Sequence, residues 1–89
     1  MMVPSIHLNG SSKESLLDDV HEARMALAAA ISALGKAWPN GRDYYPQGPD
    51  ALRKAEVEWQ ERFNRLTIVE AELTLLEHAI SEGGFKAGE

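Results

Sequence analysis

The spacing of apolar residues predicts two long amphipathic helices, over residues 12–37 and 49–82. In both segments apolar side chains recur at alternating steps of three and four residues, which places them on one face of a helix and is typical of paired helices. The stripes are Leu16, Val20, Ala23, Leu27, Ala30, Leu34 and Ala37 in the first helix, and Leu52, Ala55, Trp59, Leu66, Val69, Leu73, Leu76 and Ile80 in the second. Arg62 interrupts the second stripe, and Phe63 lies beside it.

Local signals predict where these helices begin and end. Ser11 and Glu14 have the spacing of a capping box at the start of the first helix. Pro49 suits the first position of the second helix, and Gly83-Gly84 suits its end. Two Pro and two Gly within residues 39–48 predict an irregular loop between the helices.

Segments of different character flank the predicted hairpin of residues 11–82. In residues 1–10, Ile6 and Leu8 alternate with polar residues, which predicts a short extended segment. A single strand is not stable alone in water, so this segment must lie on the helices, pair with another chain or stay mobile. We expect residues 83–89 to form a flexible tail.

The predicted fold is all-α: two long antiparallel helices that assemble further. Each helix carries a second apolar stripe that one neighbouring helix leaves uncovered. Burying a large apolar side chain contributes about 1.5–3 kcal/mol, which is sizeable against the roughly 5–15 kcal/mol net stability of a domain. We therefore expect a homo-oligomer, most simply a dimer forming a four-helix bundle. The expected interface residues are Leu17, Ile31, Val57, Ile68 and Leu75. In the alternative, a monomer covers these residues with its N-terminal segment and loop tyrosines.

Composition narrows the possible partners. The 89 residues include 9 Lys and Arg against 14 Asp and Glu, a net charge of −5, so we expect no nucleic-acid partner. The chain has no Cys, which excludes disulfides and thiolate metal sites. Its longest apolar run, residues 26–34 with Ser32 inside it, is far shorter than the ~20 residues of a membrane span. With no signal-peptide pattern at the N-terminus, these features predict a cytoplasmic protein without membrane contact.

The acidic residues are concentrated at one end of the predicted hairpin. Residues 11–25 and 66–82 hold eight acidic and two basic residues, whereas residues 26–65 hold five acidic and six basic ones. Like charges repel within a screening length of about 10 Å. Two neighbouring hairpins are therefore expected to point in opposite directions.

Candidate chemistry is sparse. His21, His78 and Glu77 come near one another at the acidic end, and two His with one carboxylate can bind a transition metal. Without a recognised metal motif we expect exposed polar residues there, with no metal and no cofactor. The chain shows no catalytic triad order, phosphate-binding loop or dinucleotide fingerprint, so we expect no catalytic residues and no enzyme activity.

The predicted loop offers a candidate partner-binding surface. It concentrates Arg42, Asp43, Tyr44 and Tyr45, residue types that can anchor a protein partner. The alternative is structural: Arg42 and Asp43 stabilise the turn, and the tyrosine rings cover the end of the helices.

Two short motifs carry a resemblance. Residues 4–12 (PSIHLNGSS), followed by residues 41–45 (GRDYY) and Gly48-Pro49, resemble a group of short uncharacterised proteins encoded in tailed-phage and prophage genomes. The resemblance covers nearly the whole chain. It implies an accessory or virion-assembly role, in the host cytoplasm or in the virion, with phage structural or host proteins as partners. It implies no catalytic residues.

Two functional hypotheses follow. The first is a non-catalytic structural or interaction protein that acts as an oligomeric helical hairpin. The alternative is an acidic regulatory binder whose charged end mimics a nucleic-acid backbone and occupies a basic site on a partner protein.

Overall fold

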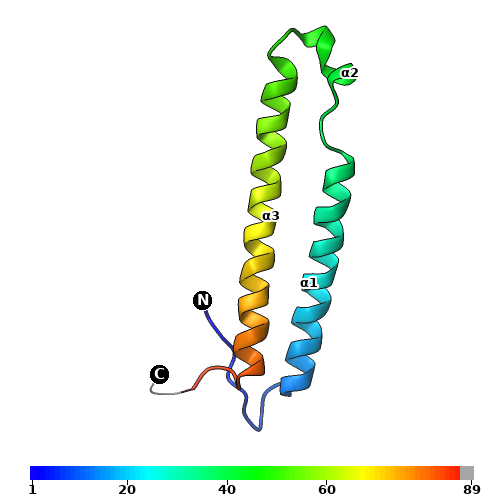
Figure 1. Ribbon diagram of the computed structural model, residues 1–89. Helices are drawn as coiled ribbons and strands as arrows, with labels where there is room; N and C mark the ends of the chain where they lie inside the picture. Colours follow the sequence, from blue (N-terminus) through cyan, green and yellow to red (C-terminus); the bar gives the residue numbers. More distant parts are fainter. Residues whose placement is uncertain (87–89) are drawn as a thin grey trace.

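The computed structural model describes residues 1–86 and shows an elongated helical hairpin (Figure 1). Helices α1 (Lys13–Lys36) and α3 (Ala51–Ser81) lie side by side and run in opposite directions, joined by a short helix α2 (Gly41–Tyr44) and a 3₁₀ turn η1 (Tyr45–Gln47). The molecule measures 62 × 24 × 16 Å. No strand occurs in the described residues. The prediction of an all-α fold with two long paired helices is confirmed.

The N-termini of the long helices differ from their predicted positions. Ser12, and not Ser11, is the N-cap of α1, and its hydroxyl accepts a hydrogen bond of 3.0 Å from the N–H of Ser15. The predicted capping box is therefore wrong by one residue. Helix α3 begins at Ala51 and not at Pro49, because a turn precedes the helix. The Ala51 N–H closes this turn by donating to the Gly48 carbonyl at 3.3 Å.

The connection between the long helices contains helical turns, so the prediction of an irregular loop is wrong. The Asn40 side chain caps α2 by accepting from the N–H of Arg42 at 3.0 Å. Pro46 lies early in η1, where its missing N–H leaves no hydrogen bond unmade. Gly48, with φ of +109°, then turns the chain toward α3.

A Schellman motif ends α3 at the predicted glycines. Gly83 has φ of +108°, its N–H reaches the Ile80 carbonyl at 3.0 Å, and the Gly84 N–H reaches the Ala79 carbonyl at 2.9 Å. These bonds satisfy carbonyls that the end of a helix leaves free. Ser81 is the last helical residue.

The two chain ends pair with each other beside this motif. Ser5 forms an isolated antiparallel bridge with Gly84, and the Phe85 N–H donates to the Pro4 carbonyl at 2.9 Å. The extended N-terminal segment thus contacts its own chain. We name this pairing of residues 4–5 with residues 84–85 the terminal clasp. Of the tail predicted to be flexible, residues 84–85 belong to this clasp and Gly83 to the Schellman motif, and residues 87–89 fall outside the described residues.

Two contacts define the register of α1 against α3. The Trp38 ring meets the Phe63 ring edge-on, with centroids 6.5 Å apart, and Arg24 binds Glu77. In both pairs the residue numbers add to 101, as they must for antiparallel helices in one register. Phe63 therefore occupies the position on the packed face that the spacing assigned to Arg62. The Arg62 guanidinium lies instead over the Trp59 ring, 5.4 Å from its centroid.

The predicted stripes also differ in detail from the packed faces. On α1, Ala23, Ala30 and Ala37 are exposed, while the half-buried apolar residues recur at the helix period of about 3.6. They are Leu16, Leu17, Val20, Leu27, Ala28, Ile31, Leu34 and, just beyond the helix, Trp38. On α3, Val69 is 44 % exposed and Glu70 is half-buried. The hairpin therefore packs along 3.6-residue rows on α1.

The hairpin buries little of itself. Among the described residues only Ala55 and Ile80 are buried, at 8 % and 1 % exposure. The radius of gyration is 19.1 Å, against about 12 Å for a compact domain of this length. The accessible surface is 6587 Å², against about 5,200 Å² for a folded monomer of this mass. The core is a single seam between two helices.

Candidate functional site

A row of apolar side chains runs along the side of α3 that faces away from α1. Val57, Ile68 and Leu75 are 50 %, 59 % and 62 % exposed. Each follows by two positions a residue that packs inward: Ala55, Leu66 and Leu73. Two residues turn a helix by about 200°, so these three side chains lie opposite the seam. We call Val57, Ile68 and Leu75 the outer row.

The five residues predicted as an oligomer interface do not form one surface on the hairpin. Val57, Ile68 and Leu75 are the outer row, whereas Leu17 and Ile31 are half-buried on α1, on the side that packs against α3. On α1 the second stripe inferred from sequence and the larger residues of the first form one broad face, because the helix turns by 3.6 residues and not 3.5. Their role in assembly stays a prediction.

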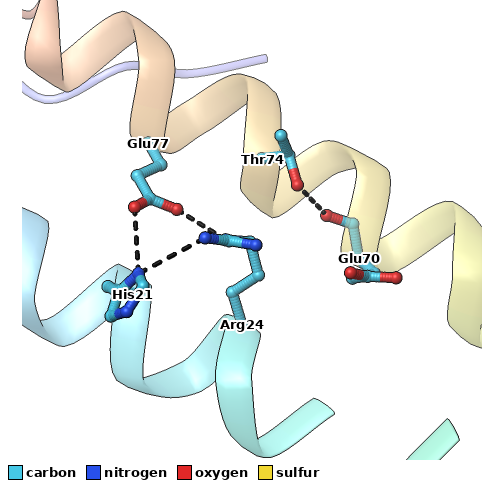
Figure 2. A network of polar contacts seen from close by, with 5 residues as sticks. All are labelled: His21, Arg24, Glu70, Thr74 and Glu77. Atoms are coloured by element: carbon cyan, nitrogen blue, oxygen red, sulfur yellow. Dashed lines mark hydrogen bonds and ion pairs between the residues drawn. The ribbon is translucent and has the colours of Figure 1, made fainter. Parts of the chain in front are cut away.

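Polar side chains from both long helices meet near the open end, the end that carries the terminal clasp (Figure 2). Nε of Arg24 donates to Oε2 of Glu77 at 2.6 Å, and Nδ1 of His21 lies 3.1 Å from Oε1 of the same carboxylate. An Arg24 terminal nitrogen, Nη2, also lies 3.3 Å from Nδ1 of His21. We call His21, Arg24 and Glu77 the polar cluster.

One nitrogen of His21 faces both an acceptor and a donor. If Nδ1 carries a hydrogen, it donates to Glu77 and cannot accept from Arg24. If Nδ1 is unprotonated, it accepts from Arg24 and its lone pair faces the carboxylate. The Arg24–Glu77 bond is independent of this choice, so it is the fixed contact of the polar cluster.

The carboxylate of Glu77 is stabilised in its charged form. The hydrogen bond from Arg24 lowers the pKa of Glu77 below the ordinary value of 4.5, with a smaller contribution from His21, while partial desolvation opposes the shift. Glu77 keeps 24 % and Arg24 22 % of the side chain exposed. At neutral pH the pair is therefore ionised and crosses the seam as a salt bridge.

The polar cluster is an ion-pair network in which no metal site is evident. His78 lines the same shallow depression as His21, but its Nε2 faces Glu82, four residues on, at 3.6 Å. Nowhere in residues 1–86 do three His, Asp or Glu side chains gather as metal ligands would. Arg24 occupies the carboxylate that a metal would need.

The predicted loop surface is divided by the structure. Tyr44 is half-buried and lines a depression with residues of the first turns of α3, whereas Tyr45 is 76 % exposed. Arg42 and Asp43 are exposed, and within the described residues their side chains form no ion pair. Tyr44 thus covers the end of α3, and Arg42, Asp43 and Tyr45 remain accessible to a partner.

The role of Arg24 was not predicted from the sequence. Arg24 follows Val20 by four positions and precedes Leu27 by three, so it fits the packed face of the first helix as well as Ala23, which the predicted stripe contained instead. A register for the hairpin was needed to bring it opposite Glu77, which lies four residues beyond Leu73 on the second helix.

Comparison with known proteins assigns no family: no family model, curated protein or solved structure matches this chain. Within the described residues, no helix combines the length and apolar character required to cross a membrane. The class that the fold itself defines is a two-helix hairpin with a polar cluster at one end and an apolar row on its outside.

Proposed function

We propose that this protein is a non-catalytic interaction protein that works as a pair of hairpins, a four-helix assembly held together by the outer row. The observation that carries this proposal is the exposure of Val57, Ile68 and Leu75 on one side of α3. A polar face would be enough for solubility, and three large apolar side chains at helical spacing form a surface that favours association.

The large accessible surface of the molecule supports association with a partner. The accessible surface of 6587 Å² exceeds the value for a compact monomer by about 1,400 Å². A stable protein interface removes about 800 Å² from each partner. Association along α3 would therefore remove more than half of this excess.

Sedimentation equilibrium at micromolar concentration tests the proposal. The chain is expected to sediment at twice its 9.8 kDa, and Ile68→Asp or Leu75→Asp to sediment as a monomer, because a buried unpaired carboxylate costs several kcal/mol. Ala26→Asp makes the same charge change at an exposed residue of α1 and is expected to leave the mass unchanged. A monomeric parent chain would refute the proposal.

A second candidate function is an acidic binder. At the open end Arg24 is held by Glu77, while Asp18, Asp19 and Glu72 are exposed, and no described residue forms an ion pair with them. This end presents negative charge that could occupy a basic site on a partner protein.

Salt separates the two candidates. A partner held by the acidic end is expected to be released between about 50 and 200 mM salt, because exposed charges are screened. Capture that persists in salt and is lost in Tyr45→Ala or Arg42→Ala would assign binding to the loop surface instead.

The biological setting in this proposal comes from the resemblance of residues 4–12 and 41–45 to phage and prophage proteins. Capsid and tail genes beside the gene for this chain would support a role in assembly. Repressor or nuclease genes beside it would support the acidic binder.

A further inference from the structure

We propose that the partner on the outer row is the outer row of a second copy, with the two α3 helices antiparallel and a two-fold axis level with residue 66. This inference rests on the proposed function and adds to it the orientation and register of the pair. Because the outer row faces away from α1, the two α3 helices lie in the middle and the two α1 helices on the outside.

The two ends of the outer row are placed symmetrically about the centre of α3. Val57 and Leu75 are both nine positions from residue 66, and Glu61 and Ala71 are both five positions from it. A two-fold interface requires that residue i of one copy meets residue j of the other, and that j meets i. In the proposed register Val57 meets Leu75 of the second copy on both sides of the axis, and each Glu61 can lay its aliphatic stem over Ala71.

Residue 66 is also the middle of α3, which spans Ala51–Ser81. The same register therefore overlaps the two helices along their full length. Ile68 lies two positions from the axis, so the Ile68 side chains of the two copies come close together at the centre. In this register Ile68 faces Asn64 of the second copy, and apolar side chains of one copy or the other recur along the interface over about 27 Å between the levels of Val57 and Leu75.

Charge selects the antiparallel orientation. Residues 51–65 contain four Lys or Arg and three Glu, whereas residues 66–81 contain three Glu and no Lys or Arg. A parallel pair would place the acidic halves side by side. The antiparallel pair places each acidic half beside the half that carries Arg53 and Lys54, so attraction replaces repulsion within the screening length of about 10 Å.

Cysteine cross-linking tests the orientation directly, because the chain has no Cys of its own. Val57→Cys and Leu75→Cys are made separately, one of them with a tag that changes its mass, and the two are mixed, allowed to exchange subunits and oxidised. We expect the mixed disulfide between the two variants, and little of either variant joined to itself. Ala26→Cys, exposed on α1, serves as the control that reports random collision.

The outcomes separate this inference from the proposed function. Self-joined Val57→Cys and Leu75→Cys dimers, without the mixed species, would establish a parallel pair and overturn the inference while leaving self-association intact. A dimeric mass with no cross-link above the Ala26→Cys control would also overturn it, since another face would then hold the copies together. A monomeric mass for the parent chain would overturn both proposals.

Discussion

The two ends of the hairpin are held closed in different ways. At the loop end the chain itself joins α1 to α3, and the seam is closed by the Trp38 and Phe63 rings, 6.5 Å apart. At the open end no covalent link joins the helices. There the terminal clasp joins the N-terminal segment to the end of α3, and the Arg24–Glu77 salt bridge joins α1 to α3.

This difference follows from chain entropy and charge. A short connection keeps two helix ends close at little further cost, so apolar packing is sufficient at the loop end. The open end must bring together two helices and a terminal segment while carrying most of the negative charge. A cation between the helices offsets part of that repulsion. We therefore expect the open end to respond more strongly to changes at single residues and to acid.

Gly84→Ala should have the largest effect on stability, because the added methyl group would disrupt the terminal clasp. Gly84 has φ of +74°, and a Cβ there would lie 2.5 Å from the Pro4 carbonyl oxygen. We expect the free energy of unfolding to fall by about 1–3 kcal/mol, measured by urea denaturation at a fixed protein concentration. In Gly35→Ala, inside α1 with open space around the added Cβ, we expect a gain of about 0.5–1 kcal/mol. Equal effects at both glycines would show that the clasp contributes nothing.

The loop end should show a smaller, purely apolar coupling. In a double-mutant cycle of Trp38→Leu and Phe63→Leu, we expect an interaction free energy of about 0.5–1.5 kcal/mol, which an edge-on aromatic pair adds beyond its buried area. The cycle is read from urea unfolding followed by circular dichroism at pH 7 and pH 4. The coupling should be the same at both pH values. A change between them would contradict the proposal that apolar packing alone closes the loop end.

The smallest expected effect is the acid response of the polar cluster. Because the folded-state pKa of Glu77 is lowered from 4.5, its contribution to stability is fully present above that value and is lost as the pH falls through the folded-state pKa. In Glu77→Gln, unfolding free energies measured from pH 6 to pH 3 should start below those of the parent chain and converge with them in acid. Glu72→Gln, at an exposed residue, should run parallel to the parent instead.

The sequence was sufficient for the paired helices and for the glycine stop, because both depend on signals that repeat or act locally. Apolar residues at steps of three and four repeat over whole helices, and Gly83 has the positive φ that a Schellman motif favours. An error of one residue at Ser12 and of two residues at Ala51 leaves these elements in place.

The details that sequence missed depend on neighbours in space. Phe63, and not Arg62, lies on the packed face because its ring meets Trp38, which follows the end of α1. Arg24 gains its role from Glu77, which lies 53 residues away. The residues of the outer row were identified as apolar from the sequence. That they face away from α1 could be known only once the side of α3 that meets α1 was known. The same knowledge separated Leu17 and Ile31 from Val57, Ile68 and Leu75.

The terminal clasp has a practical consequence for experiments. Pro4 and Phe85 are hydrogen-bonded to each other, so a fluorophore or an affinity handle fused to either terminus emerges from the same end of a rod that is 62 Å long. In an antiparallel pair two such fluorophores would be far apart, and in a parallel pair they would be neighbours. Energy transfer between identically labelled copies would then report orientation without altering a single residue of α3.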